Sequence, residues 1–532
     1  MSLQPYTGVF GKEQLIYLLK RTTFGAKKRD IDAFSNKTLT ETVDALLSPS
    51  AASLTPFPPV KNYYDPANNT DAEVLPGKTW VDTQDNARSN FRRSQSFRAW
   101  WYGLMLQQEA TILEKMTLFW HNHFPNDMDE RSAIMGYINN KTLRTNALGN
   151  FKTFVRTITL DPMMLRYLNG GANNVLAPDE NYARELQELF TLGKGPNSKY
   201  TEDDVRAAAR VLTGFQILPQ VIGFPFQAIF NPTRHDTGDK QFSAFYNNRI
   251  IHGQLGADGA KELDELLSMI FEQPEVSLFI CRKLYRFFVY YKIDTVVERD
   301  VIEPLALIFR NANYELKPVL KALFTSAHFF DTAFKGAIIK SPVDYVVGLA
   351  RECAVSLPQM DLMDFDSIKK TYEVWLSFHE DTNYGAAAQR QAVGNLPNVA
   401  GWGAYYQEPN YYRIWIDSET YPKRIKFGEI MLNDANLVKI DVIEVAKQYD
   451  SVRQITSFIN DVLMHFYSVS TSPTFKDRLR NILLSGQTDD HYWTDAWDAY
   501  IATPSVTNKS VVETRLKAFF RAIILRPEFH LM

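Results

Sequence analysis

The sequence predicts a mainly α protein: a multi-helical body with a small β-hairpin or extended insertion near residues 215–255 and long irregular loops. Apolar residues recur every three or four positions along most of the chain, which is the spacing of a buried helix face. Clusters of Gly, Pro and Asn interrupt this spacing, as turns do. The stretch around 215–255 instead has short apolar runs on either side of a polar turn, which is typical of a hairpin.

The first third of the chain has helical spacing on either side of a proline-rich segment. Residues 11–47 predict two helices separated by a turn. Six prolines between 48 and 76 predict a long surface excursion. Apolar and aromatic residues then recur from 86 to 119, which indicates two packed helices, and 130–168 continues the helical pattern.

Two further helices carry recognisable end signals. The stretch "DENYARELQELFTLGKG" keeps its apolar residues on one side and stops at Gly193, where a left-handed cap suits glycine. In "YTEDDVRAAARVLTGF", Thr201 and Asp204 have the spacing of a capping box. Both stretches are therefore predicted to be helical.

A chain of 532 residues exceeds what one hydrophobic core usually serves. We expect an N-terminal helical body over 1–345 and a C-terminal helical region over 346–532, with one continuous unit as the alternative. The second region contains an irregular loop at 385–418 that is dense in Gly, Pro, Asn and aromatic residues. We expect this loop to be ordered and to cover another part of the molecule.

The charge balance limits the classes of partner. Fifty-eight basic and sixty-one acidic residues give a formal net charge of -3, which argues against nucleic acid and anionic membrane as partners. No apolar run reaches the length of a membrane span. The chain is expected to be soluble, and a removed export signal would place it in the periplasm or outside the cell. Cys281 and Cys353 allow at most one disulfide and have no metal-binding spacing.

The stretch "LFWHNHF" places His121 and His123 one residue apart between aromatic residues. Positions two apart diverge in a helix and share a face in an extended segment. The two imidazoles can therefore bind one metal ion only if the helix ends near Trp120, an end that Pro125 would favour. The alternative is a pair of helix-end histidines bonded to backbone groups.

Polar residues also form a stripe on the predicted helix around 180–190. Asn181, Arg184, Glu185 and Glu188 follow helical spacing opposite the apolar side. Two carboxylates one turn apart suit a metal ion or a general base. The alternative is a solvated helix face with an ion pair between Arg184 and Glu188.

Two loops add candidate groups. In "RHDTGDK", His235 beside Asp236 fits an oriented imidazole, with Lys240 close by, although any Asp- and Gly-rich hairpin turn has this composition. The aromatic loop around Trp402 could stack against a sugar ring, and core packing of a long loop is the alternative. Signatures of nucleotide-binding folds, serine hydrolases and common zinc enzymes are missing from the sequence.

Ordered sequence blocks resemble a bacterial family catalogued as domain of unknown function 1800. They include "TLFWHNHF", "ENYARELQELFTLG", "YTEDDVRAAARVLTGF", "HDTGDK", "KSPVDYVVGLAR" and "LPNVAGW". The resemblance extends from about Leu15 to the C-terminus and implies a mainly helical, often exported protein with no transferable activity. It also implies that the polar residues singled out above belong to recurring blocks. One departure is Asp179-Glu180-Asn181, where the family pattern usually has Asn-Glu-Asn, and it puts a role for Asp179 in doubt.

Two functional hypotheses follow. In the first, the protein is a hydrolase-type enzyme with a polar pocket around a divalent metal ion, for which zinc, manganese or iron suits mixed nitrogen and carboxylate ligands. In the second, it is a non-catalytic exported or surface scaffold that binds a glycan or a protein partner. In the enzyme, the metal ligands would be His121 and His123, the catalytic residues Glu185, Glu188, His235 and Asp236, and the substrate contacts Asn181, Arg184, Lys240 and Trp402.

Overall fold

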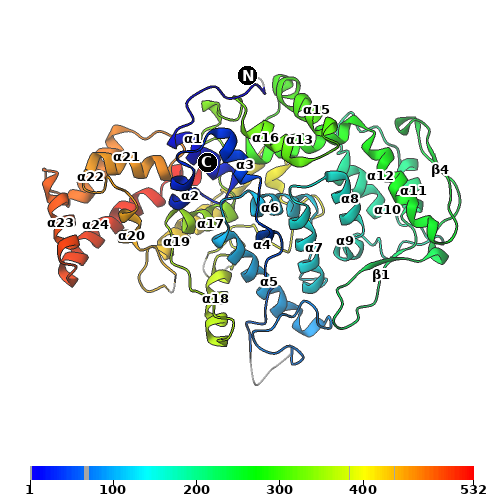
Figure 1. Cartoon of the computed structure of the whole chain (residues 1–532), viewed down its shortest axis with the longest axis horizontal. Helices are drawn as coiled ribbons and strands as arrows, with labels where there is room; N and C mark the ends of the chain where they lie inside the picture. Colours follow the sequence, from blue (N-terminus) through cyan, green and yellow to red (C-terminus); the bar gives the residue numbers. More distant parts are fainter. Residues whose placement is uncertain (1–2, 65–70, 381, 383, 437) are drawn as a thin grey trace.

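The computed structural model describes residues 3–64, 71–380, 382, 384–436 and 438–532. The predicted fold class is confirmed, because helices make up most of this part of the chain and its strands form two small sheets. In Figure 1, the C-terminal helices occupy one end of the molecule, the hairpin insertion lies at the opposite end, and the N-terminal helices lie between them.

The first half of the chain, up to the insertion, contains short helices around one long helix. They are α1 (Lys12–Thr22), α2 (Lys28–Phe34), α3 (Leu39–Leu46), α4 (Ala51–Leu54), α5 (Ala87–Gln107), α6 (Leu113–His123), α7 (Ala133–Asn146), α8 (Phe151–Thr159), α9 (Pro162–Tyr167), α10 (Glu180–Glu185), the π-helix η1 (Leu186–Thr191) and α11 (Glu202–Val211). Within the predicted surface excursion, residues 65–70 lie outside the described part of the chain.

The second half is helical apart from the 385–418 loop. Its helices are α12 (Glu262–Phe271), α13 (Pro274–Phe288), α14 (Thr295–Val297), the π-helix η5 (Glu298–Ile302), α15 (Glu303–Asn311), α16 (Leu316–Phe324), α17 (Pro342–Glu352), α18 (Phe365–Ser377), α19 (Thr420–Met431), α20 (Val442–Lys447), α21 (Ile455–Phe466), α22 (Pro473–Leu484), α23 (His491–Ala502) and α24 (Val506–Ile524). The 385–418 loop contains only the 3₁₀ turns η7 (Gly403–Tyr405) and η8 (Tyr411–Trp415).

The insertion consists of two antiparallel strand pairs rather than one hairpin. Strand β1 (Phe215–Ile217) pairs with β2 (Ala228–Phe230), and β3 (Lys240–Gln241) pairs with β4 (Ile250–Ile251). Short 3₁₀ turns at η2 (Pro232–Arg234), η3 (Ala244–Tyr246) and η4 (Gly256–Lys261) connect these strands to each other and to α12. Similar turns end other loops at η6 (Thr332–Phe334) and η9 (Pro527–His530).

Two local predictions about helix ends are confirmed. The Thr201 side chain accepts a hydrogen bond from the Asp204 amide while the Asp204 carboxylate accepts one from the Thr201 amide, so α11 begins with a capping box. Gly193 has a φ of +78°, the left-handed conformation that favours glycine. It follows the π-helix η1, which the sequence pattern did not predict.

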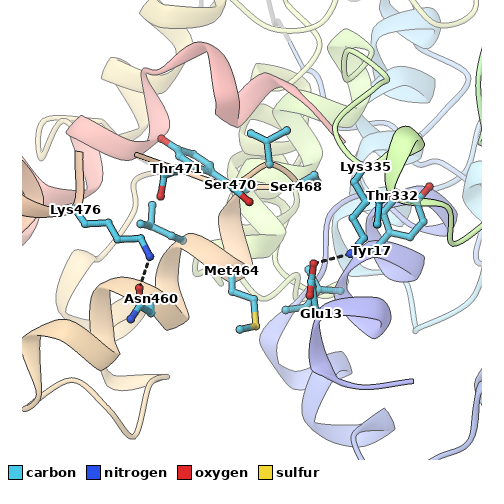
Figure 2. Close-up of a pocket in the computed structure, with 14 residues that line it drawn as sticks. Glu13, Tyr17, Thr332, Lys335, Asn460, Met464, Ser468, Ser470, Thr471 and Lys476 are labelled. Atoms are coloured by element: carbon cyan, nitrogen blue, oxygen red, sulfur yellow. Dashed lines mark hydrogen bonds and ion pairs between the residues drawn. The ribbon is translucent and has the colours of Figure 1, made fainter. Parts of the chain in front are cut away.

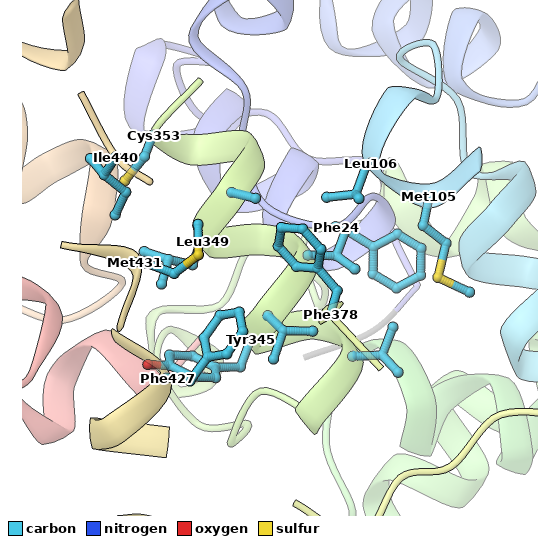
Figure 3. Packing of buried hydrophobic residues seen from close by; sticks show 14 of the residues in the cluster. Phe24, Met105, Leu106, Tyr345, Leu349, Cys353, Phe378, Phe427, Met431 and Ile440 are labelled. Carbon is cyan, nitrogen blue, oxygen red and sulfur yellow. The ribbon is translucent and has the colours of Figure 1, made fainter. Parts of the chain in front are cut away.

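The buried apolar residues form two clusters. One joins α5 to α17 and to the helices from α18 to the C-terminus, and Figure 3 shows part of it around Tyr345, Leu349 and Cys353 of α17. The other joins α1, α3 and the helices from α7 to α16. Helix α6 contributes to both, with Leu118 in the first cluster and Trp120 in the second. It therefore lies where the two clusters adjoin.

Two sequence-level expectations concern membranes and disulfides. Within the described residues, no helix combines the length and apolar character that crossing a bilayer requires. Cys281 and Cys353 are both buried and both free thiols.

Candidate functional site

Helix α6 is buried along its whole length, including its polar residues. A polar group that is removed from water needs a hydrogen-bonding partner inside the protein. Glu114 accepts hydrogen bonds from Trp101 Nε1 at 2.9 Å and Arg144 Nε at 2.9 Å. Lys115 forms an ion pair with Asp344 at the start of α17. The first turn of α6 is thus bonded to three other helices.

The last three residues of α6 contact three separate segments. His121 Nε2 accepts a hydrogen bond from the Gly394 amide at 3.0 Å. Asn122 Oδ1 accepts one from the Trp402 amide at 2.7 Å. Because successive helical side chains point about 100° apart, His123 faces a different direction from both.

His123 lies between the π-helix and α13. Its Nε2 is 3.1 Å from the Phe190 carbonyl oxygen and its Nδ1 is 2.8 Å from Lys283 Nζ. The carbonyl can only accept, so Nε2 carries the proton and Nδ1 accepts a hydrogen bond from the Lys283 ammonium. Both ring nitrogens are therefore engaged by protein groups.

Burial controls the protonation of these two histidines. It lowers the pKa of His121 to about 3, with a further lowering by the charge of Arg98. It also lowers the pKa of His123 well below the ordinary value, with Lys283 acting in the same direction. Burial together with Arg286 lowers the pKa of Lys283 to about 7. Both imidazoles are consequently neutral at physiological pH.

The condition for a shared metal ion at the histidine pair is not met in this structure. Helix α6 continues through His123 and ends only at Phe124, so Pro125 restricts the residue after the pair and not the pair itself. The two side chains diverge as helical positions two apart must. Across the described residues, no group of three or more His, Cys, Asp or Glu side chains has the arrangement of a metal site.

Trp402 lies against the same histidine. The His121 and Trp402 rings meet edge to face with their centroids 5.8 Å apart, and Trp402 is 3% exposed. Its indole therefore packs inside the protein, and its face is covered. The 385–418 loop is ordered and covers the end of α6, as expected, because the bonds from Gly394 and Trp402 fasten it there.

The residues of the polar stripe on α10 and the π-helix η1 have different partners. Arg184 forms ion pairs with Glu180 and with Glu202 of α11, in place of the expected pair with Glu188. Glu188 instead pairs with Lys194. The other stripe residue with a defined partner is Asn181, whose side chain donates to the Leu168 carbonyl.

Glu185 differs from the rest of the stripe. It is 9% exposed, and its Oε2 atom is buried without a hydrogen-bonding partner. Burial, reinforced by the negative charge of Glu188, raises the pKa of the Glu185 carboxyl. The π-helix η1 begins at the next residue, and such irregular turns are frequent at functional sites.

The third polar group forms a network of its own around Glu262. This fully buried carboxylate contacts His235 Nε2 at 2.9 Å and Lys240 Nζ at 2.5 Å. Burial acts to raise the Glu262 pKa, but these hydrogen bonds outweigh it and the pKa is lowered. Asp236 pairs with Arg210 of α11 at 2.7 Å. Asp236 and Lys240 are therefore engaged in ion pairs, and His235 is hydrogen-bonded to Glu262.

Helix α11 separates the stripe from the Glu262 network. Arg184 contacts Glu202 in its first turn, whereas Asp236 contacts Arg210 near its end. Eight residues of α-helix span about 12 Å along the axis. Among the described residues, no hydrogen bond or ion pair links the His121/His123 side chains, the stripe and the Glu262 network. The structure thus brings Trp402 to the histidine pair and leaves the other two groups apart.

Sequence reasoning missed the partners that complete these groups. Lys283 and Glu262 each lie in a helix whose sequence shows only ordinary amphipathic spacing. Asn122 was visible between the two histidines. Three consecutive polar residues, His121 to His123, point in different directions on a helix. This pattern was the available sign that the helix end contacts several segments.

A separate open groove lies between α1, α21 and the start of α22 (Figure 2). Its volume is about 740 Å³. Glu13 and Lys335 pair across one side at 2.6 Å, while Lys476 donates to Asn460 Oδ1 at 2.8 Å on the other. The lining also includes the hydroxyl groups of Thr332, Ser468, Ser470 and Thr471 and the apolar surfaces of Ile16, Leu463, Met464 and Val469.

The anchoring role of Asn122 can be tested by substitution. Asn122→Ala removes the acceptor for the Trp402 amide and leaves a buried N–H unpaired, which costs about 1–3 kcal/mol. We expect faster proteolytic cleavage within 385–418 under native conditions. Asn395→Ala removes an exposed amide from the same loop and is the matched control. Equal cleavage rates in the two variants would contradict the anchoring role.

The buried histidine also predicts a pH dependence. The His121 pKa is about 3 when folded and about 6.5 when unfolded, so below pH 6.5 the unfolded chain binds the additional proton. His121 should therefore make stability fall by about 1.4 kcal/mol per pH unit between pH 6.5 and pH 3. His121→Gln, which retains an acceptor, should flatten the urea-unfolding profile in that window. The exposed His491→Gln is the control, and an unchanged slope in His121→Gln would refute the prediction.

Comparison with known proteins identifies a family without a described activity. No curated protein and no solved structure matches the chain. The sequence model of one family, described as protein of unknown function (DUF1800), matches residues 17–531. Because the match covers nearly the whole chain, the protein belongs to the DUF1800 family.

Proposed function

We propose that the protein is a non-catalytic scaffold that binds a glycan in the groove between α1, α21 and α22. The observation that carries this proposal is the composition of the groove lining, which combines several hydroxyl groups and the Asn460 amide with apolar side chains. Sugars present hydroxyl groups that donate and accept hydrogen bonds, and their C–H faces pack on apolar surface. A volume of about 740 Å³ lies within the range of ligand pockets.

The charges in the groove favour an acidic sugar. Lys335 is paired with Glu13, but the Lys476 ammonium contacts only the neutral amide oxygen of Asn460 within the described part of the chain. A carboxylate on the ligand would give Lys476 the charge-assisted hydrogen bond that the protein does not supply. A uronic acid in an oligosaccharide has this chemistry.

Filling the groove tests this proposal. Ser470 is exposed at the groove, so Ser470→Trp would obstruct it without disturbing the core. We expect the wild-type protein to bind uronic-acid oligosaccharides in calorimetry, and Ser470→Trp to weaken binding at least tenfold. Ser510→Trp places the same ring on the exposed face of α24 as a control. Lack of binding to both acidic and neutral oligosaccharides would refute the proposal.

A second candidate function is hydrolysis, and the buried carboxyl of Glu185 is the observation that favours it. A carboxyl whose pKa is raised can hold a proton for a leaving group, while Glu188 supplies a nearby charged carboxylate. In this hypothesis Asn181 and Arg184 contact the substrate, and a divalent metal ion beside Glu185 and Glu188 would complete the centre.

The enzyme hypothesis is tested by activity and metal content together. Glu185→Gln should abolish hydrolysis of a panel of chromogenic esters, phosphates and glycosides, whereas Glu272→Gln at an exposed ion pair should retain it. Protein purified without chelator should contain one divalent metal ion per chain. Absence of both activity and metal in the wild-type protein would exclude this hypothesis and leave the glycan proposal untouched.

A further inference from the structure

Positive charge exceeds negative charge in the interior near α17. Lys20 and Lys340 share one carboxylate, Glu352, with nitrogen–oxygen distances of 3.2 and 3.7 Å. Arg424 of α19 is completely buried, and no carboxylate in the described residues lies within ion-pair distance of it. Asp344 also attracts Lys340 and Arg424, but it is paired with Lys115, so four cations face two carboxylates, Glu352 and Asp344.

The Arg424 guanidinium is also short of hydrogen-bond acceptors. Its Nη2 donates to the Lys340 carbonyl at 2.9 Å, but Nε and Nη1 are buried without a partner. These two of the three guanidinium nitrogens carry three of its five N–H donors, and the group stays protonated inside proteins. Buried guanidinium groups normally have a carboxylate or several acceptors, because an unpaired buried charge is strongly unfavourable.

His530 presents further unpartnered nitrogens at the same place. The imidazole is 0% exposed, and neither Nδ1 nor Nε2 has a hydrogen-bonding partner. Burial, then the charges of Arg424 and Lys340, lowers the pKa of His530 well below its ordinary value. A neutral imidazole still carries one N–H, so His530 offers one donor.

Backbone pairing brings these side chains together. The Lys340 amide donates to the His530 carbonyl at 2.8 Å, next to the antiparallel bridge between Ile339 and Leu531. The charges of Arg424 and Lys340 both act on the His530 imidazole, so the three side chains lie near one another, and the Lys340 ammonium lies 4.1 Å from the centroid of the adjacent Phe529 ring. Arg424 and His530 both pack on the Tyr345 ring, at 5.4 and 4.8 Å from its centroid (Figure 3 labels Tyr345).

We propose that Lys340, Arg424 and His530 bind one small monovalent anion, of the size and charge of chloride. It would accept hydrogen bonds from Arg424 Nε and Nη1 and from the His530 N–H, while Lys340 contributes charge. The three side chains are at most 3% exposed, which favours a single compact ion over a larger ligand. The ion would be enclosed when the C-terminal segment docks, and its role would be structural. This site is independent of the glycan groove.

The first test compares anions on the full chain. Urea unfolding midpoints would be measured in potassium chloride and in potassium methanesulfonate at equal ionic strength, because methanesulfonate is a much larger monovalent anion than chloride. We expect the midpoint to rise with chloride concentration and then saturate, as binding to the folded state requires. Arg424→Met should lose this dependence, whereas the exposed Arg453→Met should keep it.

A second measurement does not depend on a variant that folds. Wild-type crystals grown in sodium bromide should show an anomalous bromide peak beside Arg424 Nε and Nη1. Equal unfolding midpoints in the two salts, together with no bromide peak at Arg424, would overturn the proposal. Water molecules would then be the partners of the Arg424 and His530 N–H groups.

Discussion

The burial of α6 is the constraint on which the surrounding structure depends. Every residue of this helix is removed from solvent, yet it carries charged and amide side chains as well as two imidazoles. Such a helix is stable only if each polar side chain reaches a partner on another element. Those partners come from α5, α7, α13, α17 and the 385–418 loop, so α6 determines where segments distant in sequence meet.

This constraint also relates the polar motifs to one another. Four blocks that carry the family resemblance meet at α6. Lys115 of this helix pairs with Asp344 of "KSPVDYVVGLAR", and Asn122 bonds to Trp402 of "LPNVAGW". His123 bonds to Phe190 of "ENYARELQELFTLG". The side chains of the Glu262 network likewise have partners within the protein, through a hydrogen bond from His235 and an ion pair with Lys240. Several buried polar atoms of the described residues have no partner, among them Glu185 Oε2 beside the π-helix, Arg424 Nε and Nη1, and both ring nitrogens of His530. Our proposals therefore rest on unpartnered groups and on the groove, and less on the histidine pair and the other polar sequence motifs.

Local sequence patterns predicted the helical elements well, because helix periodicity, capping and glycine conformation involve neighbours in the chain. The Thr201–Asp204 capping box and the left-handed Gly193 are examples. The partner of His121 could not be predicted this way, because Gly394 lies 273 residues away and offers only a backbone amide. The groove could not be predicted from local patterns either, because its lining residues come from α1 and α22, which lie near opposite ends of the chain.

Hydrogen exchange at individual amides of the wild-type protein tests the role of α6 most directly. If the α6 side chains hold the loop, the Gly394 and Trp402 amides should exchange as slowly as the backbone amides within α6. The Ala400 amide, bonded only to the exposed Asn398 side chain, should exchange much faster. Exchange at Gly394 and Trp402 as fast as at Ala400 would contradict this account.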